Sequence, residues 1–119
     1  MKTQMVAAFA GLVLLLTASA GHAEQSIEQI YGVYCVQCHG LQRNGTGINV
    51  PSLSVKPRDH TDAKSMGDSS DEELTKAITE GGLAVNKSVL MPTWGQVLSE
   101  QQIKGLVQYL RQVCKCGGT

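Results

Sequence analysis

Two cysteines and a histidine are grouped in the run Cys35-Val36-Gln37-Cys38-His39, the most chemically distinctive stretch of the 119-residue chain. The spacing Cys-x-x-Cys-His is the signature of covalent c-type haem attachment. Two thiols about one helical turn apart can each form a thioether to a haem vinyl group, and the adjacent imidazole can bind the iron axially. The motif therefore predicts one haem c per chain, attached at Cys35 and Cys38, with His39 as an axial ligand of its iron.

The same cysteines allow two other interpretations. A Cys-x-x-Cys pair can act as a redox dithiol, or it can form half of a zinc site together with Cys114 and Cys116. A redox dithiol usually opens a helix in a βαβ unit, whereas this pair follows a predicted helix. The histidine in register favours haem, as do an export signal and a shortage of aromatic residues.

Three side chains could supply the second axial ligand: Met91, Met66 and His60. Met91 lies 52 residues after His39, in a stretch (90–95) that also holds a proline and the single tryptophan. A stiff loop there could bring the sulfur to the opposite face of the haem. Met66 falls in a polar loop as a surface-lining residue, and His60 is expected to be solvated. We therefore expect Met91 to be the ligand.

Three helices are predicted to position these residues. Capping pairs mark their starts: Ser26 with Gln29, Ser70 with Glu73, and Ser99 with Gln102. The first helix runs into Cys35, the second ends at Gly81-Gly82, and the third carries apolar residues at helical spacing from Ile103 to Val113. No alternating run predicts a strand, so the expected fold class is all-α.

The part of the chain after residue 23 is poor in core-forming side chains. Its 96 residues include 35 apolar ones and only four aromatic ones. A loop of about 30 residues (40–68) is also predicted between the first two helices, and loops of this length are uncommon unless they wrap something or carry function. Both features predict that a haem completes the core and that the apo-chain folds poorly.

Residues 1–23 have the composition of a secretory signal peptide. They hold 15 apolar residues, no acidic residue and one basic one, Lys2. The apolar stretch from Met5 to Leu16 is too short for a spanning helix, which needs about 20 residues, and small residues follow it. We expect cleavage after Ala20 or Ala23, a mature domain at 24–119, and a periplasmic protein without stable membrane insertion.

Charge and motifs exclude several classes of function. Residues 24–119 carry 9 basic and 10 acidic side chains, a net charge of −1. This balance gives no basic surface for nucleic acid or for an anionic membrane. The chain has no glycine-rich phosphate loop and no serine nucleophile elbow, so common enzyme signatures are absent from it.

Over residues 26–113 the chain resembles the class I monohaem c-type cytochromes. In that family a helix ends in Cys-x-x-Cys-His, and a Met-Pro loop precedes a C-terminal helix that crosses the first. The resemblance implies an all-α cytochrome c fold, with three main helices and long loops around one haem. Three stretches (58–62, Gly81-Gly82 and 91–94) are also similar to small periplasmic cytochromes of anaerobic bacteria, including metal-reducing ones.

The resemblance also assigns roles to single residues. Pro51 lies 12 residues after His39, so its carbonyl would accept a hydrogen bond from the His39 ring N–H and fix the orientation of the ring. Tyr31 and Tyr109 would form the aromatic contact where the first and last helices cross. Trp94 and Tyr109 would belong to the haem-binding set.

The expected ligand pair defines the expected function. With His39 and Met91 in both axial positions, no coordination site is open to a substrate, and a thioether ligand favours ferrous iron and raises the potential. We expect a one-electron carrier rather than an enzyme: a monomer that meets a redox donor and a redox acceptor in brief, small contacts. Two alternatives stay open: a haem subunit docked in a larger reductase or oxidase complex, and a haem enzyme or gas-binding protein with a labile Met ligand.

Cys114 and Cys116 lie outside the family pattern. One intervening residue does not fit haem attachment, and thiols in an oxidising compartment tend to pair. We expect a disulfide there, local or intermolecular, ahead of a metal or redox role.

Overall fold

The computed structural model describes residues 24–117. The expected signal peptide at 1–23 therefore lies outside the described residues. All regular structure within 24–117 is helical, without a strand, as the sequence predicts. The elements are α1 Ile27–Tyr34, α2 Val36–His39, η1 Val50–Ser52, α3 Ala63–Gly67, α4 Asp71–Glu80, η2 Gly82–Val85 and α5 Glu100–Cys114, with η1 and η2 being 3-10 helices.

The three predicted helix starts are confirmed. The Ser26 hydroxyl accepts from the Gln29 backbone N–H at 3.2 Å, and the Gln29 side chain accepts from the Ser26 backbone N–H at 2.8 Å, which makes a full capping box at α1. Ser99 and Gln102 repeat the arrangement at α5. The Ser70 hydroxyl caps α4. These pairs satisfy N–H groups that have no partner inside the helix.

Two features differ from the expected layout. The first helix stops at Tyr34, and Cys35 (φ −116°, ψ −32°) separates it from the short helix α2. The predicted featureless loop between α2 and α4 contains η1 and α3, and the Asp62 carboxylate caps α3 by accepting from the N–H groups of Lys64 and Ser65 at 3.0 Å. A five-residue helix is too short to show apolar periodicity, so its sequence signal is only the cap.

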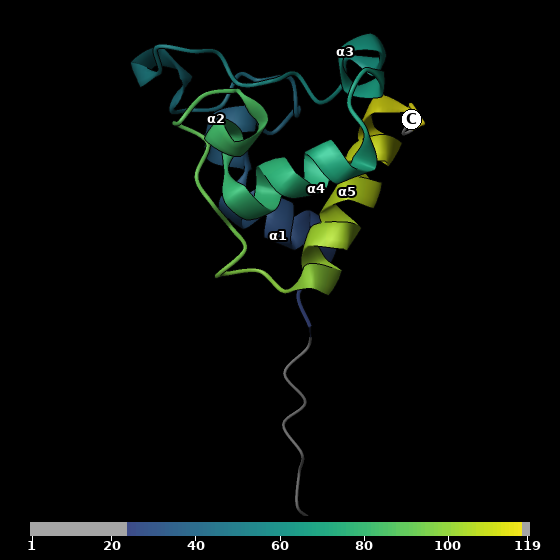
Figure 1. The fold of residues 1–119 in the computed structure, drawn as a ribbon. Coiled ribbons are helices and arrows are strands. Elements are labelled where there is room, and N and C mark those ends of the chain that lie inside the picture. The colour runs from purple at the N-terminus through teal and green to yellow at the C-terminus, as the bar shows by residue number, and fades with distance from the viewer. Residues whose placement is uncertain (1–23, 118–119) are drawn as a thin grey trace, which may run out of the picture.

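The core lies where α1, α4 and α5 pack together (Figure 1). Ile30 and Tyr31 of α1 and Leu106 of α5 are among its most buried side chains. Gly105 allows the close approach of α5 to α1, because a Cβ there would lie 2.5 Å from Cδ1 of Ile27. The long loops extend to one side of this three-helix core (Figure 1).

Met66 is part of the core, and the prediction that it lines the surface is wrong. Its side chain is fully buried. The cause is a tie between α3 and α5: the Arg111 guanidinium donates to the carbonyls of Met66 and Ser69 at 2.7 and 2.6 Å and to the Asp71 carboxylate at 2.8 Å. These bonds hold α3 against α5, with Met66 pointing inward.

The expected disulfide is local and joins Cys114 to Cys116 at the C-terminal end of α5. Among the described residues, no helix is long and apolar enough to cross a membrane.

Candidate functional site

The Cys-x-x-Cys-His run (35–39), which we call the attachment segment, is held at its carboxyl end by backbone hydrogen bonds. The carbonyls of Gln37, Cys38 and His39 accept hydrogen bonds from the backbone N–H groups of Asn49 (2.8 Å), Gly47 (3.0 Å) and Gly45 (2.8 Å). These carbonyls have no partner within so short a helix, so the loop supplies what the helix lacks. We call this loop (45–49) the clamp loop.

Gly47 is required by the closeness of the clamp loop to α2. A Cβ at this position would lie 2.3 Å from the Gln37 oxygen and 2.6 Å from the Cys38 carbonyl carbon, both backbone atoms. The absence of a side chain at Gly47 therefore permits the hydrogen bonds that Gly45 and Asn49 donate on either side of it.

The two motif thiols are unpaired and half-buried. Burial, and then the neighbouring Cys38, raises the pKa of the Cys35 thiol to about 12. A reactive dithiol needs a lowered pKa, so this environment does not favour a redox dithiol. A four-thiolate zinc site is not assembled either, because Cys114 and Cys116 are bonded to each other and no group of three or more His, Cys, Asp or Glu in residues 24–117 could hold a metal.

The His39 ring is oriented by a backbone carbonyl. Its Nδ1 lies 2.9 Å from the carbonyl oxygen of Arg58, and because a carbonyl can only accept, Nδ1 carries the proton and donates. Nε2 is then the nitrogen with a free lone pair, which is the state an axial haem ligand needs. Burial lowers the pKa of His39, which also favours the neutral ring.

The prediction that the Pro51 carbonyl accepts the hydrogen bond from the His39 ring is wrong. Pro51 lies in η1 and is exposed, and the accepting carbonyl belongs to Arg58, seven residues later in the chain. The path of the loop explains the difference, because the His60 backbone N–H donates to the Arg43 carbonyl at 2.8 Å and so brings residues 58–60 back to the end of α2. The type of contact is the expected one, made by a different residue.

His60 is buried, and the prediction that it is solvated is wrong. Its ring stacks on that of His39 with centroids 3.9 Å apart and planes inclined by 19°. Its Nδ1 is hydrogen-bonded to the Tyr31 hydroxyl at 3.0 Å. Burial, followed by the charges of His39 and Arg58, lowers the pKa of His60 well below its usual value, so the ring is neutral.

Met91 lies in a segment fixed to the end of α4. The Gly82 N–H donates to the Met91 carbonyl at 3.1 Å, and the Trp94 N–H donates to the Ile78 carbonyl at 3.0 Å. Gly81 (φ +87°) makes the sharp turn this requires, since a Cβ there would lie 2.9 Å from the Met91 oxygen. Met91 is half-buried and packs against the same core as Cys35.

The aromatic residues lie within that core or pack against it. Tyr31 and Tyr109 meet where α1 and α5 pack, with ring centroids 5.3 Å apart, as expected for the first and last helices. Trp94 packs on Tyr34 at 5.2 Å. The Tyr109 hydroxyl accepts a hydrogen bond from the Arg43 guanidinium, which also pairs with Glu28 at 2.7 Å. Trp94 and Tyr109 thus pack on aromatic residues of α1, and their contact with haem stays a prediction.

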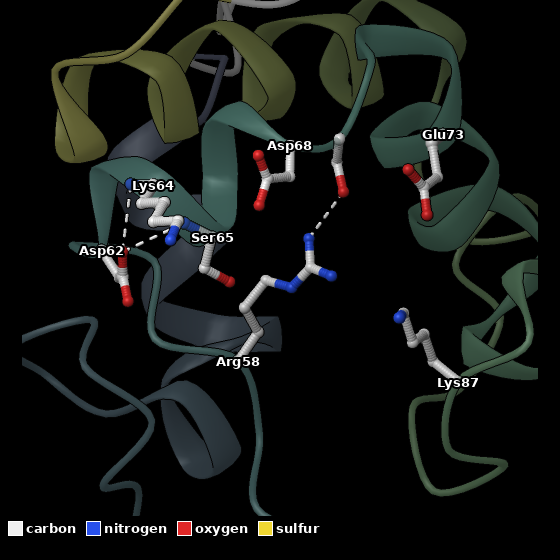
Figure 2. A pocket seen from close by; sticks show the side chains of 8 residues that line it. Arg58, Asp62, Lys64, Ser65, Asp68, Glu73 and Lys87 are labelled. Carbon is white, nitrogen blue, oxygen red and sulfur yellow. Dashed lines mark hydrogen bonds between the residues drawn. The ribbon is translucent and has the colours of Figure 1, made fainter.

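A polar cavity of about 400 Å³ lies beside Arg58 (Figure 2). Its charged lining residues are Arg58, Lys64, Lys87, Asp62, Asp68 and Glu73. The Arg58 guanidinium donates to the Ser69 hydroxyl at 2.8 Å across the edge of the cavity (Figure 2). Three cationic and three acidic side chains balance each other, so the cavity favours neither an anion nor a cation.

These residues fit a covalently attached haem. Two free thiols adjoin an imidazole whose Nδ1–H is already bound, which leaves Nε2 for a metal. The sequence pattern predicts the thiols, the imidazole and Met91, but it gives no sign of the Arg58 carbonyl, of the clamp loop, or of the stacking of His60 on His39. A backbone carbonyl carries no side-chain signature, and His60 sits among polar neighbours, so neither had a local signal.

Comparison with known proteins gives an independent view. A family model described as "Cytochrome C oxidase, cbb3-type, subunit III" matches residues 22–110. A solved structure named "KustC0563 c-type cytochrome" is similar, with 26% identity, a TM-score of 0.59, and coverage of 75% of this chain and 98% of that one. Comparison with curated proteins found no match.

Proposed function

The chain belongs to the c-type cytochrome family, and from this premise we propose that it is a periplasmic one-electron carrier. Membership implies a haem c that is covalently bound, and it implies a role in electron transfer. When bound, the haem iron supplies a centre that gains or loses one electron. We assign the thioether bonds to Cys35 and Cys38, and the axial positions to His39 and Met91.

The orientation of His39 carries this proposal. Its Nδ1–H is held by the Arg58 carbonyl at 2.9 Å, beside the free Cys38 thiol, so that Nε2 is the available donor. A hydrogen bond of this kind fixes the ring and raises the basicity of the ligating nitrogen. A half-buried histidine with only a packing role would not need this fixed ring orientation directly after two unpaired cysteines in the sequence.

The Met91 segment supports a second fixed ligand. The Met91 N–H donates to the Ser88 carbonyl and the Met91 carbonyl accepts from the Gly82 N–H, so the backbone that carries the sulfur is held at both its amide and its carbonyl group. Two fixed axial ligands would keep the same coordination in both redox states and leave no site open for a substrate. This favours a carrier over an enzyme or a gas-binding protein.

Optical spectra and ligand binding of the holoprotein test the assignment of Met91. The wild-type ferric protein is expected to be low-spin, to show the long-wavelength iron–sulfur band, and to resist cyanide and azide. The Met91→Ala variant is expected to lose that band, bind both anions and have a lower reduction potential, because a soft neutral ligand is lost.

Met66 supplies the matched control. It is the other methionine considered as a ligand, but it is fully buried in the core beside α5. The Met66→Leu variant is expected to keep the wild-type spectrum and potential. An unchanged spectrum in Met91→Ala, or loss of the iron–sulfur band in Met66→Leu, would contradict the assignment.

Export is proposed from the sequence of residues 1–23. Most of these residues form an apolar stretch with a basic start and small residues at its end, as in signal peptides. Intact mass of the protein from a periplasmic extract should correspond to a chain that begins at Gly21 or at Glu24, with one added haem. Recovery of the full-length chain with the cytoplasmic fraction would contradict periplasmic export.

We propose that electron-transfer partners dock near α2. Three large apolar side chains near the attachment segment are exposed: Val33 by 51%, Leu41 by 71% and Ile48 by 85%. With a nearly neutral chain, encounter with a redox partner should depend weakly on salt. Stopped-flow electron exchange at rising ionic strength measures this, and a steep dependence would point to a charged docking face instead.

One alternative function has a specific observation in its favour. The matching family model is named for a subunit of an oxidase complex, which favours a haem subunit docked in a larger assembly. Gel filtration of a native extract distinguishes the two proposals. A free carrier elutes below the 12.7 kDa of the full 119-residue chain, because the signal peptide has been removed, whereas a subunit elutes with much larger proteins.

A further inference from the structure

His60 lies against the proposed axial ligand, and the functions assigned so far do not use it. Its side chain is only 8% exposed. Its ring is nearly parallel to that of His39, with centroids 3.9 Å apart and an angle of 19° between the planes. The stack covers one face of the His39 ring and leaves the ring edge accessible, where Nδ1 donates to the Arg58 carbonyl.

The hydrogen bond from His39 does not by itself fix the ring. The bond from Nδ1–H to the Arg58 carbonyl sets the position of one ring atom, but the ring plane can still turn about that direction. A flat neighbour in van der Waals contact removes this freedom, because turning the ring would drive its edge into His60. Arg58 and His60 therefore restrain two different motions of the same imidazole.

His60 is itself fixed to the helical core. Its backbone N–H donates to the Arg43 carbonyl at 2.8 Å, and its Nδ1 is hydrogen-bonded to the Tyr31 hydroxyl at 3.0 Å. Tyr31 is 2% exposed in α1 and packs on Tyr109 of α5. The ring that restrains His39 is thus anchored where the first and last helices cross, and not only in its own loop.

We propose that His60 is a positioning residue that fixes the plane of the His39 imidazole and excludes water from its face. The inference rests on the proposed ligation by His39 and deepens it. The magnetic anisotropy of a low-spin ferric haem depends on the orientation of its axial ligand planes. Water near an axial ligand favours the more highly charged ferric state, so a covered ligand keeps the potential higher.

Three variants of the holoprotein separate stacking from simple volume. His60→Phe keeps a flat ring without nitrogens, His60→Leu keeps a similar bulk without a flat face, and His60→Ala opens the site to water. The measurements are the g-values of the ferric protein by electron paramagnetic resonance and the reduction potential. We expect His60→Phe to stay near wild type in both, and His60→Leu and His60→Ala to show altered g-values, with the lowest potential in His60→Ala.

Tyr31→Phe adds a test of the anchor. It removes only the hydrogen bond at Nδ1 of His60, and we expect a smaller change in g-values than in His60→Leu. If His60→Ala does not retain haem, His60→Leu and His60→Phe still provide the comparison.

Two results would overturn the inference. One is wild-type g-values and potential in His60→Leu and in any His60→Ala that holds haem. The other is a change in His60→Phe as large as that in His60→Leu, because the flat face would then not matter. A wild-type protein without a low-spin, histidine-ligated spectrum would overturn the proposed function together with the inference, whereas a normal wild-type spectrum with unchanged variants overturns the inference alone.

Discussion

Replacement of Gly47 by alanine tests whether the clamp loop holds the haem-attachment helix. A Cβ on Gly47 would lie 2.3 Å from the Gln37 oxygen, a separation that backbone contacts do not tolerate. To reach even 3.0 Å the loop must move by about 0.7 Å. That movement lengthens the hydrogen bonds to Gln37 (2.8 Å) and Cys38 (3.0 Å) beyond the range in which they are effective.

The expected loss can be estimated from those two bonds. Each contributes about 1 kcal/mol net, and the reduced entropy of an unfolded chain with alanine offsets about 0.4–1 kcal/mol of the total. The Gly47→Ala variant should therefore be less stable by about 1–1.6 kcal/mol, which corresponds to a melting temperature lower by about 4–13 °C for a domain of this size. Thermal unfolding of the holoprotein followed by far-ultraviolet circular dichroism measures this.

Gly32 gives a matched control, because it is exposed in α1 and a Cβ there meets no atom within 4 Å. Gly32→Ala is expected to raise stability by about 0.5–1 kcal/mol, since glycine inside a helix costs backbone entropy. If Gly47→Ala melts at or above the wild-type temperature while Gly32→Ala behaves as expected, the clamp loop does not restrain α2 in the way described.

Three further predictions concern the ends of the fold and the prosthetic group. Arg111→Lys should lower the free energy of unfolding by about 1–3 kcal/mol, because a lysine cannot reach two carbonyls and a carboxylate together. Chemical denaturation measures this loss, and wild-type stability of the variant would show that the Arg111 bonds between α3 and α5 are not needed. The double change Cys114→Ser and Cys116→Ser should lower the free energy of unfolding by at most about 1.6 kcal/mol, because a bond between residues only two apart restricts the unfolded chain little. A larger loss in the same assay would argue for a further role of the disulfide. The double change Cys35→Ser and Cys38→Ser, which prevents attachment, should leave a chain with little native helix by circular dichroism, and cooperative unfolding of that chain would contradict the view that haem completes the core.

Local signals predicted the starts of three helices. The capping pairs at Ser26, Ser70 and Ser99 each lie at the start of a helix, because a cap depends on residues only three apart. The Cys-x-x-Cys-His motif is likewise visible in the sequence, since its chemistry is carried by side chains close together, and ligation by Met91 stays a prediction.

Long-range contacts could not be predicted in the same way. The partner of His39 is a carbonyl 19 residues away, and every residue has a carbonyl, so only the path of the loop decides between Pro51 and Arg58. His60 and Met66 were misjudged for a related reason. Both lie in polar stretches, and their burial depends on contacts with Tyr31 and Arg111, which are distant in sequence.

The enclosure of the attachment segment also constrains the order of events during maturation. Burial raises the pKa of Cys35 in the folded arrangement, so a smaller fraction of this thiol is the reactive thiolate at neutral pH than in a free cysteine. The closed clamp loop and the packed core would therefore slow any chemistry at this sulfur. Attachment is favoured on a chain that has not yet closed, and the finished fold is suited to protecting a thioether bond rather than to forming one.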